Sequence, residues 1–193
     1  MKLKGDNIFW DLDGVLRNLT YKFLGSPFTQ GEVDGWERTN DKGQDVVSFV
    51  DNNLEVLTDA PECEYMEVAR LFSPIHVVSA QPDSWRRHTS AWLDAHIPDA
   101  RVKYLTDTHH KLYYLDAGFR VLVEDCPLYA SYRDIILIDR PYNQDITVPR
   151  RVKTPEELLI ELRRFIDGGN DRRISNEQPE RRIWRNDKNM GGT

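Results

Sequence analysis

The sequence predicts an α/β fold: an open, mainly parallel five-stranded sheet flanked by helices. Short apolar runs recur along the chain, and most are continuous and β-branched, as in strands buried on both faces of a parallel sheet. Stretches with helical spacing lie between these runs, and this alternation favours right-handed crossovers. With 193 residues, 39% of them hydrophobic, the chain is long enough for one domain with an insertion and a sizeable core.

Each element can be placed from its local pattern. The predicted strands are residues 8–10, 75–78, 102–105, 120–123 and 135–138. A helix is predicted over 83–96, where Trp92 and Leu93 lie on one face and Pro98 follows. The run Thr-Pro-Glu-Glu at 154–157 is a capping box with Pro at the first helical position, and it predicts the start of the last helix.

The segment 16–73 is too long for one crossover and interrupts the alternation. It contains a polar, Gly-rich stretch at 25–43 and two helical patterns at 45–57 and 62–72. We therefore predict a core domain of residues 1–15 and 74–169, a small helical cap of residues 16–73 over the strand ends, and a flexible polar tail of 170–193. The aromatic residues Tyr21, Phe28 and Trp36 of this cap either stack on a substrate or form the cap's own core.

Charge and cysteine content restrict the function classes. A net charge of -6 gives no general attraction to nucleic acid or anionic lipid, although paired arginines in the tail leave nucleic-acid contact as an alternative. Cys63 and Cys126 lie far apart, which argues against a disulfide framework or a zinc site. No apolar run is long enough to span a bilayer, so we expect a cytoplasmic protein. The pattern does not predict an oligomeric state.

Polar residues follow several of the predicted strands. Asp11 and Asp13 follow the first strand, Ser79 the second, and Glu124 and Asp125 the fourth. Asp11 and Asp13 alone, beside Gly14, could equally belong to a β-turn. In an open α/β sheet, however, ligands bind beyond the carboxyl ends of the strands, where these groups would converge. Such hard oxygen ligands favour Mg²⁺ over zinc.

The order of these motifs resembles the haloacid dehalogenase superfamily of phosphotransferases. The first motif is matched by Asp11-Leu12-Asp13-Gly14-Val15, the second by Val77-Val78-Ser79 and the fourth by Val123-Glu124-Asp125. The resemblance covers roughly residues 7–143 and implies a Rossmann-like core with a cap between the first and second motifs. Asp13 points to a phosphatase, because the dehalogenase branch and the transport ATPases of this superfamily keep no acid there.

The resemblance also implies roles for individual residues. Asp11 would be the nucleophile that forms an aspartyl-phosphate, and Asp13 the general acid and base. Mg²⁺ would be held by Asp11, the carbonyl of Asp13 and Asp125. Glu124 stands where many relatives have a second Asp, and its longer side chain could reach the metal through water instead of as a direct ligand.

The phosphoryl group would be bound by the second and third motifs. The resemblance implies a hydrogen bond from Ser79, helped by the backbone N–H groups of Leu12 and Ala80. The third motif is a Lys, for which we favour Lys111, with Lys103 as the alternative. Its neighbours His109 and His110 could touch substrate or be exposed loop residues.

The substrate is suggested by a finer similarity. The runs Glu-Asp-Cys-Pro at 124–127 and Arg-Pro-Tyr-Asn at 140–143 are similar to those of 5'(3')-deoxyribonucleotidases, which implies a nucleoside monophosphate as the small phosphorylated substrate. Arg140 and Asn143 would contact that substrate or brace the last loop, and Trp36 is a further possible contact. The alternatives are a phosphatase for the 3' ends of polynucleotides and a catalytically idle binding protein.

Overall fold

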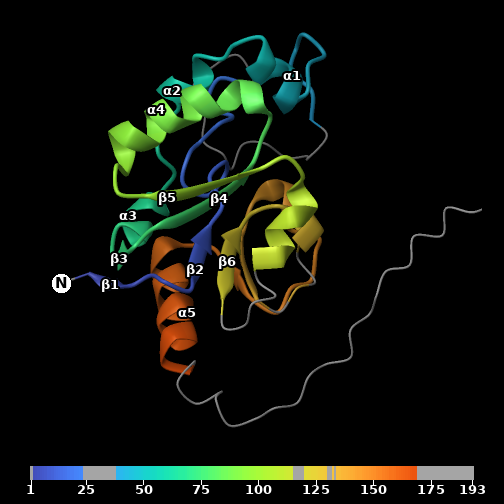
Figure 1. The fold of residues 1–193 in the computed structure, drawn as a ribbon. Coiled ribbons are helices and arrows are strands. Elements are labelled where there is room, and N and C mark those ends of the chain that lie inside the picture. Colours follow the sequence, from blue (N-terminus) through green and yellow to red (C-terminus); the bar gives the residue numbers. More distant parts are fainter. Residues whose placement is uncertain (1, 24–37, 115–119, 130–131, 133, 169–193) are drawn as a thin grey trace, which may run out of the picture.

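A six-stranded parallel sheet forms the centre of the molecule (Figure 1). The computed structural model describes residues 2–23, 38–114, 120–129, 132 and 134–168. The strands, in the order β5-β4-β2-β6-β7-β8 across the sheet, are β5 (Arg101–Leu105), β4 (His76–Ala80), β2 (Ile8–Trp10), β6 (Val121–Glu124), β7 (Ile135–Ile138) and β8 (Arg151–Val152). The expected α/β fold with a mostly parallel, helix-flanked sheet is thus confirmed.

The sheet has one strand more than predicted. The additional strand, β8, pairs with β7 and contains only two residues, Arg151 and Val152, so it leaves no apolar run in the sequence. Two further short strands, β1 (Leu3–Lys4) and β3 (Phe72–Ser73), form a separate parallel pair. The five predicted strands appear with ends shifted by at most two residues.

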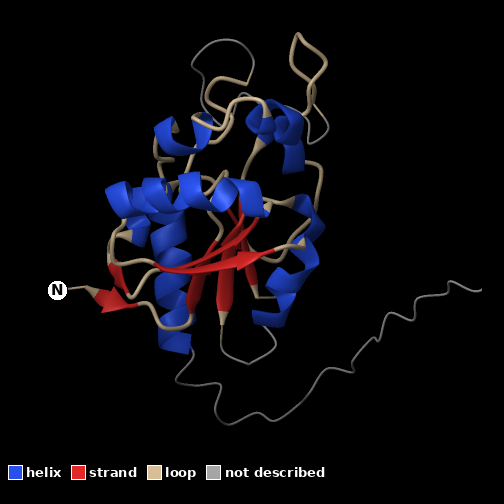
Figure 2. Ribbon diagram, turned by 45° about the horizontal axis from the view of Figure 1, so that its top comes forward, coloured by secondary structure: helices blue, strands red, loops and turns tan. Residues whose placement is uncertain are grey.

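Apolar layers cover both faces of the sheet, and helical segments lie on both sides of the strands (Figure 2). Ile8 and Trp10 of β2 face a layer that includes α3 (Met66–Ala69), α4 (Arg86–His96) and α5 (Pro155–Gly168). Phe9 faces the opposite layer, with contributions from η3 (Thr108–Tyr114) and η4 (Pro127–Tyr129). The central strands are buried throughout, and their side chains point alternately to the two faces, which produces the two cores.

The last two helices follow their sequence signals closely. The helix predicted over 83–96 consists of a 3₁₀ turn, η2 (Asp83–Trp85), followed by α4. At the start of α5 the Thr154 hydroxyl accepts the N–H of Glu157 at 3.2 Å. The Glu157 carboxylate accepts the N–H of Lys153 at 2.6 Å, not that of Thr154 as a capping box would require.

The helix predicted over 45–57 is wrong in extent. The structure has two short helices instead, α1 (Val46–Asp51) and α2 (Val56–Asp59). The side-chain amides of Asn52 and Asn53 donate to the carbonyls of Ser48 and Phe49, both at 2.7 Å, and so compete with continuation of the helix. Similarly, α3 is much shorter than the predicted 62–72 helix, and Phe72, the last residue of that prediction, pairs with β1 instead.

The segment 16–73 contributes to two different cores. Apolar residues of α1 and α2 pack with Leu19, Tyr21 and Trp85 in a separate cluster, whereas α3 packs in the main core and against α5. Tyr21 is therefore a core residue of the first cluster, while Phe28, Trp36 and the tail 170–193 lie outside the described residues. Among the helices described, none is long and apolar enough to cross a membrane.

Candidate metal and phosphoryl-transfer site

Strand order places the candidate site at the centre of the sheet. The chain runs from β2 outward through β4 to β5, then returns to the other side of β2 for β6, β7 and β8. In open α/β sheets, the crevice for ligands lies at this reversal, beyond the carboxyl ends of the two diverging strands. Asp11 follows β2, Glu124 ends β6 and Asp125 follows it. The Asp11 N–H donates to the Val123 carbonyl at 2.9 Å and so ties the two strand ends together.

Three carboxylates converge at this point. Asp11, Glu124 and Asp125 are all buried, and each offers an oxygen within 4.8 Å of the others. Lys111, on η3, lies beside them, with its Nζ 2.6 Å from Asp11 Oδ1 and 2.9 Å from Glu124 Oε2. These four side chains come from three separate parts of the chain, and sequence reasoning placed all of them in the site.

The charges of this cluster do not cancel. Burial, and then repulsion from Glu124, raises the pKa of Asp11 well above its ordinary value. Burial also raises the pKa of Glu124, against the opposing attraction of Lys111. Burial opposes a charge on Lys111 as well, but Asp11 and Glu124 outweigh that effect and hold the pKa of its ammonium well above the usual value. Lys111 thus stays charged, and if all three acids ionise, the four groups together carry a formal charge of two minus.

Glu124 holds other groups in place. Besides the bond from Lys111 to Oε2, its Oε1 accepts the N–H groups of Asp125 and Cys126 at 3.2 and 3.1 Å. Both oxygens therefore have protein donors, so Glu124 is the least available of the three acids for direct metal binding. Its extra methylene lets it reach back to Lys111 while still supporting the loop that carries Asp125.

Asp125 has a different environment. The Tyr142 hydroxyl donates to its Oδ2, and the Asn143 side chain donates to its carbonyl at 2.8 Å. Burial, followed by repulsion from Asp11, raises the pKa of Asp125 to about 6. Tyr142 was not singled out from the sequence, although it lies between Arg140 and Asn143, which were.

Arg140 and Asn143 are held by protein groups. Arg140 donates to the Glu64 carboxylate at 2.7 Å and to the Gly14 carbonyl at 2.8 Å. Asn143 Oδ1 accepts the Arg140 N–H at 3.0 Å, and both side chains are buried. These bonds agree with the bracing alternative: the loop after β7 supports the turn after β2 and the backbone of Asp125.

Asp13 lies outside the group of three acids. Both of its carboxylate oxygens accept hydrogen bonds from Arg17, with Nε to Oδ1 at 2.7 Å and Nη2 to Oδ2 at 3.1 Å. Its side chain keeps 23% of its exposure, whereas Arg17 is fully buried. Sequence reasoning missed Arg17; the available signal was its position four residues after Asp13, directly after the apolar residues Val15 and Leu16.

Gly14 explains the tight turn between Asp13 and the next segment. Its φ of +89° lies in the left-handed region, and a Cβ built there would lie 1.9 Å from Asp125 Oδ2. Only a residue without a side chain lets the Asp125 carboxylate approach the turn this closely. The glycine of the first motif thus belongs to the geometry of the acid cluster.

The remaining predicted residues lie nearby or elsewhere. Leu12 packs its side chain into the main core, and Ser79 and Ala80 end β4, just beyond Val77, the β-partner of Trp10. Lys103 is exposed on the edge strand β5, whereas Lys111 is buried and ion-paired with Asp11 and Glu124. His110 is exposed and lies against Tyr113, with their ring centroids 5.4 Å apart.

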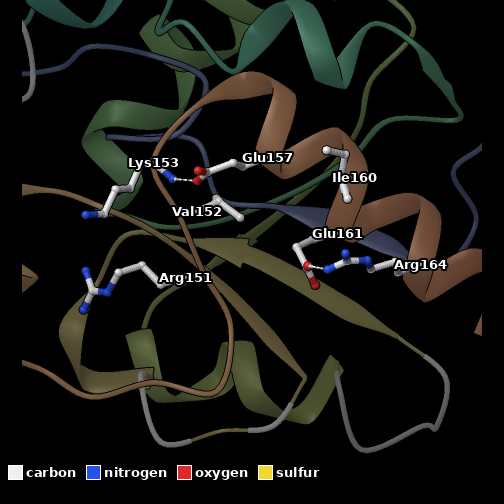
Figure 3. Close-up of a pocket in the computed structure, with 7 residues that line it drawn as sticks. All are labelled: Arg151, Val152, Lys153, Glu157, Ile160, Glu161 and Arg164. Atoms are coloured by element: carbon white, nitrogen blue, oxygen red, sulfur yellow. Dashed lines mark hydrogen bonds and ion pairs between the residues drawn. The ribbon is translucent and has the colours of Figure 1, made fainter.

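A separate cavity of about 370 Å³ lies between β8 and α5 (Figure 3). It is lined by Arg151, Val152, Lys153, Glu157, Ile160, Glu161 and Arg164. The Arg151 guanidinium donates hydrogen bonds to the side chains of Asp139 and Asn143. It also donates to the backbone carbonyls of Asn143 and Ile146. Because its charges are largely paired and it contains none of the cluster acids, this cavity is not the candidate site.

Comparison with known proteins assigns no family to the chain. No protein-family model matches it, and no curated protein matches it. What is established is an α/β fold with a mostly parallel sheet and, at its central strand ends, a buried acidic triad that could hold a metal ion.

Proposed function

We propose that this protein is a magnesium-dependent phosphatase of the haloacid dehalogenase type that hydrolyses nucleoside monophosphates through an aspartyl-phosphate on Asp11. The observation that carries the proposal is the buried cluster at the end of β2, in which Asp11 lies 2.6 Å from Lys111 and beside Asp125. A carboxylate and a phosphoryl group are both negative, so attack of one on the other needs positive charges close to the two groups.

The residues present fit a hard divalent cation. The donors are carboxylate oxygens, with no sulfur or imidazole among them, and the two minus charge of the ionised cluster is equal and opposite to that of Mg²⁺. Asp11 and Asp125 would hold the ion, since Glu124 is engaged with Lys111 and backbone N–H groups. When bound, Mg²⁺ offsets the negative charge of the phosphoryl group and of its transition state.

The chain's own residues would divide the reaction into two displacements. An Asp11 carboxylate oxygen attacks phosphorus, the bond from phosphorus to the ester oxygen breaks, and Asp13 gives its proton to the departing alcohol. Water then attacks the aspartyl-phosphate, Asp13 takes a proton from that water, and phosphate leaves Asp11 free again. Lys111 keeps its ammonium against Asp11 and balances charge during both steps.

The substrate class rests on the similarity of residues 124–127 and 140–143 to deoxyribonucleotidases. In this chain the second run braces the site, because Tyr142 contacts Asp125 and Arg140 contacts Gly14. A nucleoside monophosphate would therefore be bound by residues other than this run.

The test is a panel of phosphate-release assays with purified protein and Mg²⁺. The substrates are nucleoside 5'- and 3'-monophosphates, sugar phosphates, 3'-phosphorylated oligonucleotides and an aryl phosphate. We expect turnover of nucleoside monophosphates that a chelator abolishes and that Asp11→Asn lowers by about 1,000-fold or more. Faster turnover of oligonucleotides, falling steeply with salt, would favour the polynucleotide alternative. Absence of hydrolysis of every substrate would favour the idle binding protein.

A further inference from the structure

Arg17 is a fully buried cation that connects the proposed acid and base to two helices. Its guanidinium binds both oxygens of Asp13, at 2.7 and 3.1 Å. Its Nη1 donates to the Leu57 carbonyl at 2.8 Å and to the Thr89 hydroxyl at 3.2 Å. One face of the guanidinium lies over the Trp92 ring, 5.6 Å from its centroid. These contacts fix the guanidinium from several directions.

The network continues to the end of β4. The Thr89 hydroxyl donates to Gln81 Oε1 at 2.8 Å, and Gln81 directly follows the strand that carries Ser79. Leu57 belongs to α2 and Thr89 to α4, two helices that pack on each other. Contacts with these two helices in the protein interior therefore hold the Arg17 guanidinium in position.

A two-point ion pair restricts Asp13 more than a single hydrogen bond could. The planar fork of a guanidinium matches a carboxylate in one orientation, so Asp13 cannot rotate without breaking a bond. Its carboxylate lies outside the acid triad and is partly exposed, on the turn that follows Asp11. An acid that protonates a leaving alcohol must lie farther out than the nucleophile, because the phosphoryl group lies between them.

We infer that Arg17 is a positioning residue that orients Asp13, so that the carboxyl proton, held on a lone pair that Arg17 does not use, points at the leaving oxygen of the substrate. The inference rests on the proposed phosphatase activity and assigns to Arg17 a role in proton transfer, not in attack by Asp11. Loss of Arg17 then impairs substrates whose leaving group needs a proton much more than substrates whose leaving group departs as a stable anion.

Leaving-group dependence tests this role. Wild type and Arg17→Met are compared on a nucleoside 5'-monophosphate, which releases an alkyl alcohol, and on p-nitrophenyl phosphate, which releases a stable phenolate. We expect Arg17→Met to lower turnover of the nucleotide by about 100-fold, the range for one positioned acid or base. The first equivalent of nitrophenolate should appear within about threefold of the wild-type rate, because forming the aspartyl-phosphate then needs no proton donor.

Three further variants separate positioning from folding. Thr89→Val removes an Arg17 contact but keeps the pair between Arg17 and Asp13. The ratio of its nucleotide turnover to its rate of first nitrophenolate release should therefore equal that of wild type. Arg17→Lys keeps a buried cation without the two-point fork and should show an intermediate ratio; it supplies the readout if Arg17→Met does not fold. Asp13→Asn should show the Arg17→Met pattern, with no further loss of that ratio in the double variant.

The outcomes are distinct. An equal loss on both substrates in Arg17→Met, or a wild-type ratio in Arg17→Lys, would overturn the positioning role and leave Arg17 a structural residue. If wild type hydrolyses neither substrate with Mg²⁺, the proposed phosphatase function itself is wrong. If wild type is active and Asp11→Asn is not, that function stands whatever the Arg17 variants show.

Discussion

At the scale of single residues, Lys111, which the sequence favoured, and its alternative Lys103 have different environments in the structure. Lys111 is buried between Asp11 and Glu124, whereas Lys103 is exposed on an edge strand. A fixed cation in a buried site interacts with developing charge far more strongly than a solvated one. The pair thus offers a matched comparison within one chain.

We expect Lys111→Met to lower phosphatase turnover by about 100-fold or more, because the nucleophile and phosphoryl group lose their neighbouring positive charge. Lys103→Met should keep wild-type turnover, since it removes a surface amine. Steady-state rates with saturating Mg²⁺ check both variants, with circular dichroism to confirm folding. Near-normal turnover in Lys111→Met would remove this residue from the proposed mechanism.

Single residues also show where sequence reasoning stopped. Asp11, Glu124 and Asp125 could be predicted as neighbours because each lies at the end of an apolar strand, and parallel strands align their carboxyl ends. The bonds that organise them could not be predicted in this way. Arg17 and Tyr142 act through side-chain directions set by tertiary packing, and the spacing of residues in a sequence does not fix those directions.

At the scale of elements, the turn after β2 connects Asp11 to the other half of the candidate site. Gly14 lets Asp125 approach, its carbonyl accepts a bond from Arg140, and its N–H donates to the Arg17 carbonyl at 2.9 Å. The turn therefore contacts Asp125 after β6, Arg140 in the loop after β7, and Arg17, which follows the turn in the chain.

Gly14→Ala should disrupt the metal site while the fold persists. A Cβ there would lie 1.9 Å from Asp125 Oδ2, so the carboxylate must move. We expect at least a tenfold loss of Mg²⁺ affinity, measured by calorimetric titration. Gly43→Ala is the control, since Gly43 also has a positive φ of +71° but open space around it. It should cost about 1 kcal/mol of stability and leave Mg²⁺ binding unchanged; equal Mg²⁺ affinities in the two variants would contradict a specific role for the close approach.

Elements also differ in how well the sequence predicts them. In a buried strand such as β7 every residue is apolar, so the whole strand can be recognised from the sequence. The helix α5 begins where Thr154 and Pro155 predict. In contrast, α1 ends where Asn52 and Asn53 cap carbonyls with their side chains, a competition that helical spacing of apolar residues does not reveal. The strand β8 depends wholly on its neighbour β7, because two residues alone have no strand preference to detect.

At the scale of the whole molecule, the buried acids make stability depend on pH and metal. The unfolded chain releases the Asp125 proton near 3.8 and the folded protein near 6, so the metal-free folded state binds more protons between these values. Stability of the metal-free protein due to Asp125 therefore falls as the pH rises from about 4 to 6 and stays low above it.

Asp125→Asn should consequently stabilise the metal-free protein at pH 8, by on the order of 2 kcal/mol, and give no such gain at pH 4. The amide oxygen can still accept the Tyr142 hydroxyl, so packing is largely kept. Urea unfolding with a chelator at both pH values measures the difference. Added Mg²⁺ should raise the stability of wild type and leave Asp125→Asn unchanged. A gain of equal size at both pH values would point to packing instead of charge.

The central place of β2 has a consequence for how the chain folds as it is made. β2 is synthesised first among the strands of the main sheet, yet its neighbours on either side, β4 and β6, come much later in the chain. During synthesis from the amino terminus, β2 and Asp11 therefore lack one or both neighbouring strands until residues 121–125 have been made. The Asp11 carboxylate gains Lys111, Asp125 and the candidate cation site only after most of the domain exists, so the nascent chain cannot bind a cation there early.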